Sequence, residues 1–135
     1  MNELEQIASS LGLPETWEER NGSWWMAPAS LDVRVMAAVL RSHEARFVTL
    51  TAMQLLPDER IRIDYHWDLD GRLLTFTTFA VENRVPSIVD LCEAADWVER
   101  ETHENFSVEF TGRPYEPLLL RTGDASGLQL RKERS

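Results

Sequence analysis

Apolar residues at three- and four-residue spacing predict two short helices in the first third of the chain. Asn2 is placed to cap the first helix and Gly12 to end it. Ser30 can cap the second helix, with Asp32 in its first turn and His43 near its carboxyl end. The buried faces are formed by Leu4, Ile7, Ala8 and Leu11 in the first helix and by Val33, Met36, Ala37 and Leu40 in the second.

Strict alternation of apolar and polar residues predicts a strand from Arg60 to Leu69, with one face in the core and the other exposed to water. Asn21-Gly22 and Asp70-Gly71 are typical of tight turns between antiparallel strands. Runs of β-branched and apolar residues predict the remaining strands. The predicted strands are 17–20, 23–26, 47–55, 60–69, 72–81 and 108–110.

A third helical pattern begins at Leu91 and continues to Phe106. Its apolar face is narrow, so much of the helix is free to contact something other than its own core. An aromatic side chain and an arginine beside acids are typical of an interface. An exposed helix stabilised by pairs within it, such as Arg100 with Glu104, is the alternative. Helical spacing groups Trp97, Arg100, Glu101 and Glu104 on one flank.

The predicted elements indicate an α+β fold in two layers, with helices packed on a mixed, mostly antiparallel sheet. The 135 residues are enough for one core. We expect residues 1–120 to form a single domain and residues 121–135 to be a flexible or partner-docking tail. The apolar run Leu118–Leu120 comes directly before that tail. In the second predicted strand, Trp24 and Trp25 occupy opposite faces, so one of them lies under a loop or contacts a partner.

Charge and hydropathy exclude some partners. The chain has 23 acidic and 14 basic residues, a formal charge of -9, which repels nucleic acid and anionic membrane surfaces. No stretch approaches the ~20 apolar residues that span a bilayer, so we expect no direct membrane insertion. The acidic start lacks the features of a signal peptide, and Cys92 is a single cysteine that we expect to be a reduced, buried thiol.

A metal site is the sharpest catalytic alternative. His66 and Asp68 have the spacing of two ligands on one strand face, and His43 or His103 can complete a two-histidine, one-carboxylate triad. The double-stranded β-helix that usually carries such a triad needs about eight strands, more than this chain supplies. We therefore favour a histidine on the polar face that is held by Asp64 or Asp68.

Other catalytic patterns are weak. Cys92 and His103 are eleven positions apart, too far to pair along one helix, and the scattered glycines form no phosphate-binding motif. A lone cysteine cannot ligate an iron-sulfur cluster. The acid pair Glu99 and Glu101 is expected to be solvated on a surface helix. The residues thus predict no catalytic, cofactor-binding or metal-binding site in this chain.

Residues 95–114 join a charged helix to a short strand and a Gly-Arg-Pro turn, and this pattern resembles the signature of one family. That family is the C subunit of NADH-quinone oxidoreductase (respiratory complex I) together with the related subunit of membrane-bound energy-converting hydrogenases. This chain departs from the signature at Glu104, Ser107 and Arg113, where the family has Asp, Gly and His. Segments 65–71, 85–90 and 130–132 resemble other parts of that family's sequence. The matching residues are Glu99, Arg100, Glu101, Glu104, Phe106, Val108, Phe110, Gly112 and Pro114, among which Glu104 matches the family's Asp in charge only.

The resemblance implies a non-catalytic hydrophilic scaffold subunit in the peripheral arm of an NADH dehydrogenase type complex or a related hydrogenase. Its implied partners are the large hydrogenase-like subunit and the adjacent iron-sulfur subunit. Iron-sulfur clusters, flavin or a nickel-iron centre are then expected only in partner subunits. The implied location is cytoplasmic, peripheral to the inner face of the cell membrane through those partners.

The predicted partner interface lies on the signature helix and the turn that follows it. A free-standing α+β ligand-binding or regulatory module, as a monomer or a dimer, is the alternative from another functional class. Whether the parent complex uses NADH, another donor or hydrogen stays open. The predicted interface residues are Trp97, Glu99, Arg100, Glu101, Glu104, Phe106, Phe110, Gly112, Arg113 and Pro114.

Overall fold

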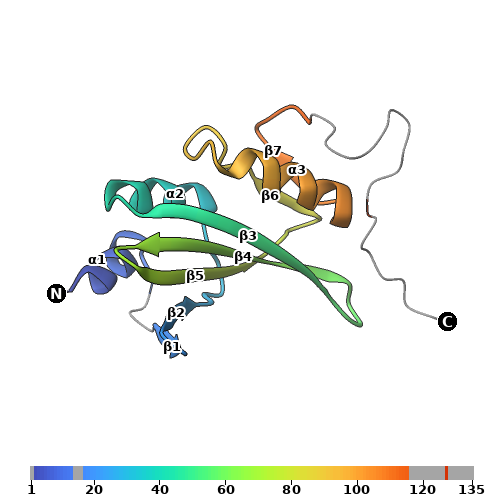
Figure 1. Cartoon of the computed structure of the whole chain (residues 1–135). Helices are drawn as coiled ribbons and strands as arrows, with labels where there is room; N and C mark the ends of the chain where they lie inside the picture. The colour runs from blue at the N-terminus through green and yellow to red at the C-terminus, as the bar shows by residue number, and fades with distance from the viewer. Residues whose placement is uncertain (1, 14–16, 116–126, 128–135) are drawn as a thin grey trace.

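The computed structural model describes residues 2–13, 17–115 and 127. Helices pack on one face of a twisted sheet, so the α+β prediction is confirmed (Figure 1). The predicted domain boundary at residue 120, the run Leu118–Leu120 and most of the predicted tail lie outside these residues. The elements are α1 (Glu3–Ser10), β1 (Glu18–Arg20), β2 (Ser23–Met26), α2 (Val33–Ser42), β3 (Arg46–Leu55), β4 (Arg60–Leu69), β5 (Arg72–Phe79), β6 (Arg84–Pro86), α3 (Ala95–Phe106) and β7 (Glu109–Thr111).

The main sheet has the strand order β1-β2-β5-β4-β3. Only β2 and β5 are parallel, and the other neighbours are antiparallel, so the sheet is mixed and mostly antiparallel as predicted. The turn pairs Asn21-Gly22 and Asp70-Gly71 all have positive φ angles, between 51° and 84°. This is the backbone conformation that a two-residue hairpin turn needs, and it explains why these pairs join β1 to β2 and β4 to β5.

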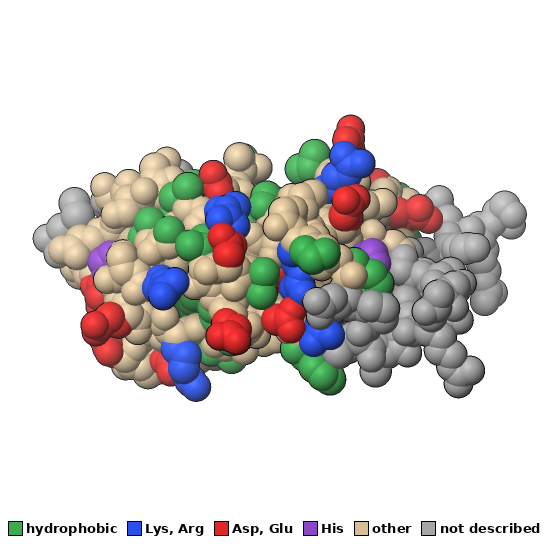
Figure 2. Space-filling view, turned by 90° about the horizontal axis from the view of Figure 1, so that it is seen from above, with side chains coloured by type: hydrophobic (Ala, Val, Ile, Leu, Met, Phe, Trp, Pro, Cys, Tyr) green, Lys and Arg blue, Asp and Glu red, His purple; other side chains and the backbone are tan. Residues whose placement is uncertain are grey.

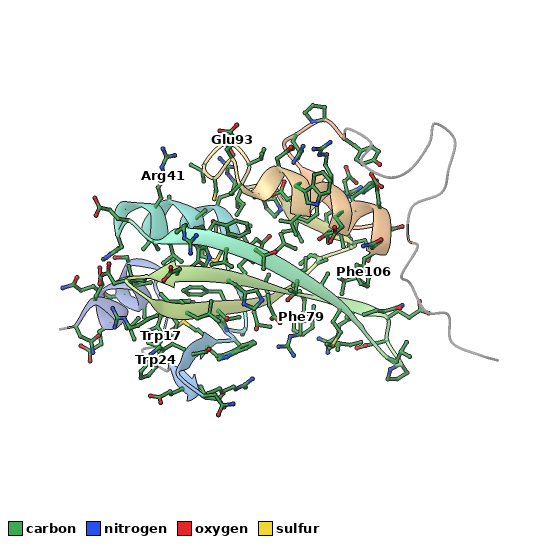
Figure 3. All side chains as sticks on the ribbon, in the orientation of Figure 1. Trp17, Trp24, Arg41, Phe79, Glu93 and Phe106 are labelled. Carbon is green, nitrogen blue, oxygen red and sulfur yellow. The ribbon has the colours of Figure 1, made fainter. Side chains whose placement is uncertain are left out.

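The core lies between the helices and the covered face of the sheet. Every second residue of β4, from Ile61 to Leu69, is at most 2% exposed, in agreement with the alternation in the sequence. Trp17, labelled in Figure 3, packs edge-on against Phe76 with 5.2 Å between ring centroids. Its Nε1 donates to the carbonyl of Leu4. The helical faces contribute Leu4, Ile7, Ala8, Val33, Met36, Ala37 and Leu40 to the same core.

The opposite face of the sheet carries polar side chains around His66. Its Nδ1 lies 2.9 Å from Thr75 Oγ1 and its Nε2 lies 3.1 Å from Thr51 Oγ1. The ring of Trp25 meets His66 edge-on, with 6.2 Å between ring centroids. Burial lowers the pKa of His66 below its usual value. Trp25 is therefore the tryptophan of the Trp24-Trp25 pair that lies on this face.

The carboxylates predicted to hold His66 bind other groups. Asp64 accepts a hydrogen bond from Thr77 Oγ1 at 2.6 Å, and Asp68 pairs with Arg46 at 3.1 Å. The prediction that Asp64 or Asp68 holds His66 is thus wrong. The reason is that Thr75 stands opposite His66 on β5 and Thr51 stands opposite Asp64 on β3, so that both threonine hydroxyls contact the His66 ring.

The other two histidines contact groups on other elements of the fold. His43 contacts Glu3 at 3.1 Å, where α2 ends near α1, and His103 on α3 contacts the carbonyl of Val108 at 2.9 Å. Within the described ranges, no three His, Cys, Asp or Glu side chains are grouped so as to hold a metal ion. The three histidines therefore do not form the triad that their sequence spacing allowed.

Three local predictions differ from the structure. Asp32, and not Ser30, caps α2, because its side chain accepts from the backbone N–H groups of Arg34 and Val35. The helix α3 begins at Ala95 and not at Leu91, since residues 88–94 form tight turns. The strand β6 was not predicted, because it has three residues and includes a proline.

Cys92 lies in these turns before α3. Its side chain is half-buried, less covered than the buried thiol that was expected. Burial raises the pKa of the Cys92 thiol above its usual value, although the backbone N–H groups of Ala94 and Ala95 oppose that change. A raised pKa disfavours the reactive thiolate, so Cys92 has the character of a structural cysteine.

Candidate partner interface

The signature segment, residues 95–114, folds into α3 and β7, and the preceding strand β6 forms one unit with them. Ser107 ends α3 in the left-handed conformation, with φ 56°, and this bend sends β7 back beside the helix. β7 then pairs in parallel with β6. Gly112 has φ +86°, a conformation that favours glycine, and this turn carries Arg113 back toward the first turn of α3. Figure 1 shows α3 lying beside this small sheet and above the main one.

Glu99 is buried at the centre of this unit, with only 1% of its surface exposed. Its carboxylate accepts from Ser87 Oγ at 2.6 Å, from the N–H of Ile88 at 2.9 Å and from Arg113 Nη1 at 3.2 Å. Burial raises the pKa of Glu99, although these three donors oppose the rise. The expectation that Glu99 is solvated beside Glu101 is therefore wrong.

Asp96 joins two guanidinium groups at the start of α3. One carboxylate oxygen accepts from Arg113 Nη2 and the other from Arg100 Nη2 at 3.1 Å. The Arg113 guanidinium lowers the pKa of Asp96 below its usual value. Along the helix, Arg100 thus pairs with Asp96, which lies one turn before it. The alternative interpretation had paired Arg100 with Glu104, one turn after it.

Glu104 is fully buried at the other end of α3. Its Oε2 accepts from the hydroxyl of Tyr115 at 2.7 Å. The Tyr115 ring also lies 4.3 Å from the ring of His103, between centroids. Burial and the neighbouring Glu104 raise the pKa of Tyr115 to about 12. The chain that follows Gly112 is therefore fixed to both ends of the helix, through Arg113 and through Tyr115.

We call Ser87, Asp96, Glu99, Arg100 and Arg113 the α3 network. Two of its members, Ser87 and Asp96, were not among the predicted interface residues, and Ser87 is the one outside α3 and the turn that follows β7. Its hydroxyl donates to Glu99, its N–H donates to the carbonyl of Thr111 at 2.9 Å, and its carbonyl accepts from Arg34 Nη1 at 2.7 Å. Ser87 thus connects α3, β7 and α2. Its only signal in the sequence was its position in segment 85–90, which resembles the family.

The predicted interface residues divide by exposure. Trp97 is 58% exposed, and Gly112 and Pro114 are exposed at the turn. Glu101 and Phe106 are half-buried. Glu99, Glu104 and Phe110 are buried, so they pack beneath this surface and do not form part of it. The contact of this surface with a partner stays a prediction.

A small cleft lies between α3 and β7, with a volume of about 210 Å³. Arg100 Nε is buried here, and no hydrogen-bond partner for it occurs in the described part of the chain. From the helical side of the molecule, acidic, basic and apolar side chains are interspersed and no kind dominates (Figure 2). The cleft is lined by Glu99, Arg100, His103, Glu109, Phe110, Thr111, Gly112, Arg113 and Tyr115.

Comparison with known proteins identifies the family. Residues 27–135 match the family described as the respiratory-chain NADH dehydrogenase, 30 Kd subunit. The chain belongs to this family. The NAD(P)H-quinone oxidoreductase subunit J of Synechococcus sp. (strain WH7803) is 31% identical over 122 residues, which cover 80% of this chain and 67% of that protein. Subunit J of Prochlorococcus marinus (strain MIT 9211) is 44% identical over 50 residues, 37% of this chain and 28% of that protein.

Two solved structures share the fold of this member of the 30 Kd subunit family. One is the trypsin-resistant fragment (1-134) of Nqo5, with a TM-score of 0.61 and 24% identity, covering 82% of this chain and 94% of the fragment. The other belongs to the membrane-bound sulfane sulfur reductase, an archaeal respiratory membrane complex, with a TM-score of 0.72 and 20% identity. That match covers 93% of this chain and 78% of the other. In the described residues, no helix is long and apolar enough to cross a membrane.

Proposed function

We propose that this chain is a non-catalytic scaffold subunit in the peripheral arm of an NADH-quinone oxidoreductase or of a related energy-converting hydrogenase. Family membership supports a place in such a complex. The observation that carries the scaffold role is the α3 network. Its carboxylates and guanidinium groups bind one another and hold α3 in place, and Trp97 stands exposed on the helix that they fix.

A scaffold of this kind acts by position. Electron transfer between neighbouring subunits depends on the distance between their redox centres, so a rigid subunit that fixes its neighbours supports transfer without taking part in it. The α3 network supplies that rigidity, because each of its ion pairs joins α3 to the turn after β7 or to another part of the helix. A surface held in one geometry loses little conformational freedom when a partner binds.

The proposed partners are the large hydrogenase-like subunit and the adjacent iron-sulfur subunit. Iron-sulfur clusters, flavin or a nickel-iron centre belong to partner subunits in this proposal, and the chain attaches to the inner face of the cell membrane through them. The match to subunit J from strain WH7803 spans about two thirds of that protein, and the Prochlorococcus match spans less than a third. The partners are therefore proposed from the family and not from the full relatives.

Purification of the native assembly tests this proposal. The chain is tagged in its native host, purified in mild detergent and analysed by mass spectrometry for proteins that accompany it. We expect an iron-sulfur subunit and a large hydrogenase-like subunit in stoichiometric amounts, and their identity names the electron donor. Recovery of the chain alone under these conditions would contradict the scaffold role.

Trp97→Ala tests the surface itself. Exposed tryptophans at interfaces often contribute a large share of the binding free energy, so we expect recovery of the partner subunits to fall about tenfold or more. The far-ultraviolet circular dichroism of the isolated chain should not change, because the Trp97 side chain is largely in solvent. Val35→Ala, at a 41% exposed apolar position on α2, is the matched control and should assemble normally.

A second candidate function, a ligand-binding module, is favoured by one observation on the opposite face of the sheet. A cleft of about 430 Å³ lies there beside Trp25, with the Arg20 guanidinium 4.9 Å from the Trp25 ring centroid. Arg62 and Phe79 line the same cleft. If the tagged chain is recovered alone, a thermal-shift screen with small anionic and aromatic compounds follows, and Trp25→Ala should abolish any shift.

A further inference from the structure

Within the described residues, no strand pairs with the edge of β7 that faces away from β6. The N–H of Glu109 donates to the carbonyl of Asn83 at 2.8 Å, and the carbonyl of Thr111 accepts from the N–H of Ser87 at 2.9 Å. The backbone groups of Glu109 and Thr111, the first and last residues of β7, therefore face β6. Alternate residues of a parallel strand direct their backbone groups to opposite sides. The N–H and carbonyl of Phe110 therefore point away from β6. Among the described strands, the small sheet contains only β6 and β7.

A second unsatisfied donor lies in the same cleft. Arg100 Nε is buried and has no acceptor among the residues described, although Nη2 of the same side chain binds Asp96. Phe110 and Arg100 both line the cleft of about 210 Å³ between α3 and β7. A buried donor without an acceptor costs free energy, and native structures rarely contain one. Arg100 Nε is thus a donor that an acceptor from outside the described residues can satisfy.

The charges around the cleft indicate which acceptor fits. The guanidinium groups of Arg100 and Arg113 already share the carboxylates of Asp96 and Glu99, and Glu109 lines the cleft as well. Charge balance therefore does not require another carboxylate. A neutral backbone carbonyl satisfies Arg100 Nε without adding to the negative charge. An extended chain also supplies a carbonyl and an N–H for Phe110, as in the addition of a strand to a sheet edge.

We propose that an extended segment of a neighbouring subunit lies in this cleft along the free edge of β7, and that one of its backbone carbonyls accepts a hydrogen bond from Arg100 Nε. The proposal rests on the proposed scaffold function and specifies which kind of partner segment the interface binds. Trp97 and the turn at Gly112 then belong to the exposed surface around this cleft. Recognition depends on the backbone of the partner more than on its charged side chains.

Photo-crosslinking in the assembled complex tests where the segment lies. The crosslinking residue p-benzoyl-phenylalanine replaces Tyr115, which lines the cleft, and the purified complex is irradiated and analysed by mass spectrometry. We expect one linked peptide from a neighbouring subunit. The same residue in place of Phe79, on the opposite face of the sheet, is the control and should not give that peptide. Links to residues 116–135 of this chain, or no links, would overturn the proposal.

Hydrogen exchange of the unmodified protein provides an independent measurement, in case the crosslinking variant fails to assemble. Amide exchange is compared between the assembled complex and the full chain on its own, with resolution at single residues. We expect the Phe110 amide to be protected at least tenfold more in the complex, whereas the amide of Glu109, already bonded to Asn83, changes less. Equal exchange of the Phe110 amide in both forms counts against the added strand.

Arg100→Lys tests the side-chain contact, since lysine keeps the charge and lacks Nε. We expect about a tenfold lower yield of the crosslink, with Arg46→Lys on β3 as a control that keeps the wild-type yield. An unchanged yield for Arg100→Lys would remove Arg100 from the proposal. If the chain is purified without partners, the scaffold function fails; if partners accompany it but the cleft gives no crosslink and no protection, only this inference fails.

Discussion

Glu99 shows how a charged residue of the signature serves the fold. Its carboxylate is buried and receives hydrogen bonds from Ser87, Ile88 and Arg113, three groups outside its own helix. These donors compensate for part of the cost of taking a carboxylate out of water. Because burial still raises the pKa of Glu99, the compensation is incomplete, and this has a measurable consequence.

The stability difference between the natural chain and Glu99→Gln should depend on pH. The pKa of Glu99 in the fold lies above its ordinary value of 4.5, so the folded state binds a proton more tightly than the unfolded state. The resulting stabilisation is fully present below about pH 4.5 and is lost as the pH rises through the folded pKa. We therefore expect the natural chain to lose stability relative to Glu99→Gln over this range, as measured by urea denaturation between pH 4 and pH 8.

Glu101→Gln is the matched control for this measurement. It lies on the same helix, is half-buried and changes the formal charge by the same amount, while the buried carboxylate of Glu99 remains. Because Glu99 is unchanged in this variant, the loss of stability with rising pH that Glu99 causes should remain. A constant difference between the natural chain and Glu99→Gln at all pH values would show that the Glu99 carboxyl titrates alike in the folded and unfolded states.

At the scale of elements, the structure shows which of two residues, Ser30 or Asp32, caps the start of α2. Asp32 accepts hydrogen bonds from two backbone N–H groups, of Arg34 and Val35, whereas Ser30 lies two residues further from the helix. We expect Asp32→Ala to lower the free energy of unfolding by about 1 kcal/mol. Ser30→Ala should change it by less than about 0.5 kcal/mol. Urea denaturation at neutral pH measures both, and equal effects would contradict the assignment of the cap.

Long elements with a clear period were predictable from the sequence. The alternation from Arg60 to Leu69 gave the bounds of β4, and the positive-φ turns followed from Asn21-Gly22 and Asp70-Gly71. β6 was not predictable, because a three-residue strand carries no period and its pairing with β7 is a contact between distant parts of the chain. The start of α3 was placed too early because tight turns share the spacing of a helix.

The candidate interface was predictable only in part, for a related reason. The exposure of Trp97 and the turn at Gly112 follow from local patterns. The burial of Glu99 and Glu104 does not, because a helical pattern assigns charged residues to solvent unless their partners are known. Those partners, Ser87, Ile88, Arg113 and Tyr115, lie 11 to 14 residues away in the sequence, and only the fold brings them together.

At the scale of the whole molecule, α3 packs directly on β3, and one arginine of α2 binds the unit of β6, α3 and β7 from the side of that helix. Arg34 binds Asp90 with two hydrogen bonds of 2.8 Å and donates to the carbonyl of Ser87 at 2.7 Å. The Arg34 guanidinium lowers the pKa of Asp90 to about 2. Because Ser87 also holds Glu99, this contact joins α2 to the α3 network and orients the proposed interface relative to the rest of the chain.

Arg34→Ala should therefore loosen the β6–α3–β7 unit more than the main sheet. We expect amide hydrogen exchange to become several-fold faster between residues 84 and 111, where the lost contacts lie, with little change in β4, whose amides pair with β3 and β5 on both sides. Arg46→Ala removes an arginine ion pair on the main sheet, with Asp68, and should leave residues 84–111 unchanged. If exchange in Arg34→Ala rose equally in all elements, the contact would stabilise the fold as a whole and would not specifically hold the interface in place.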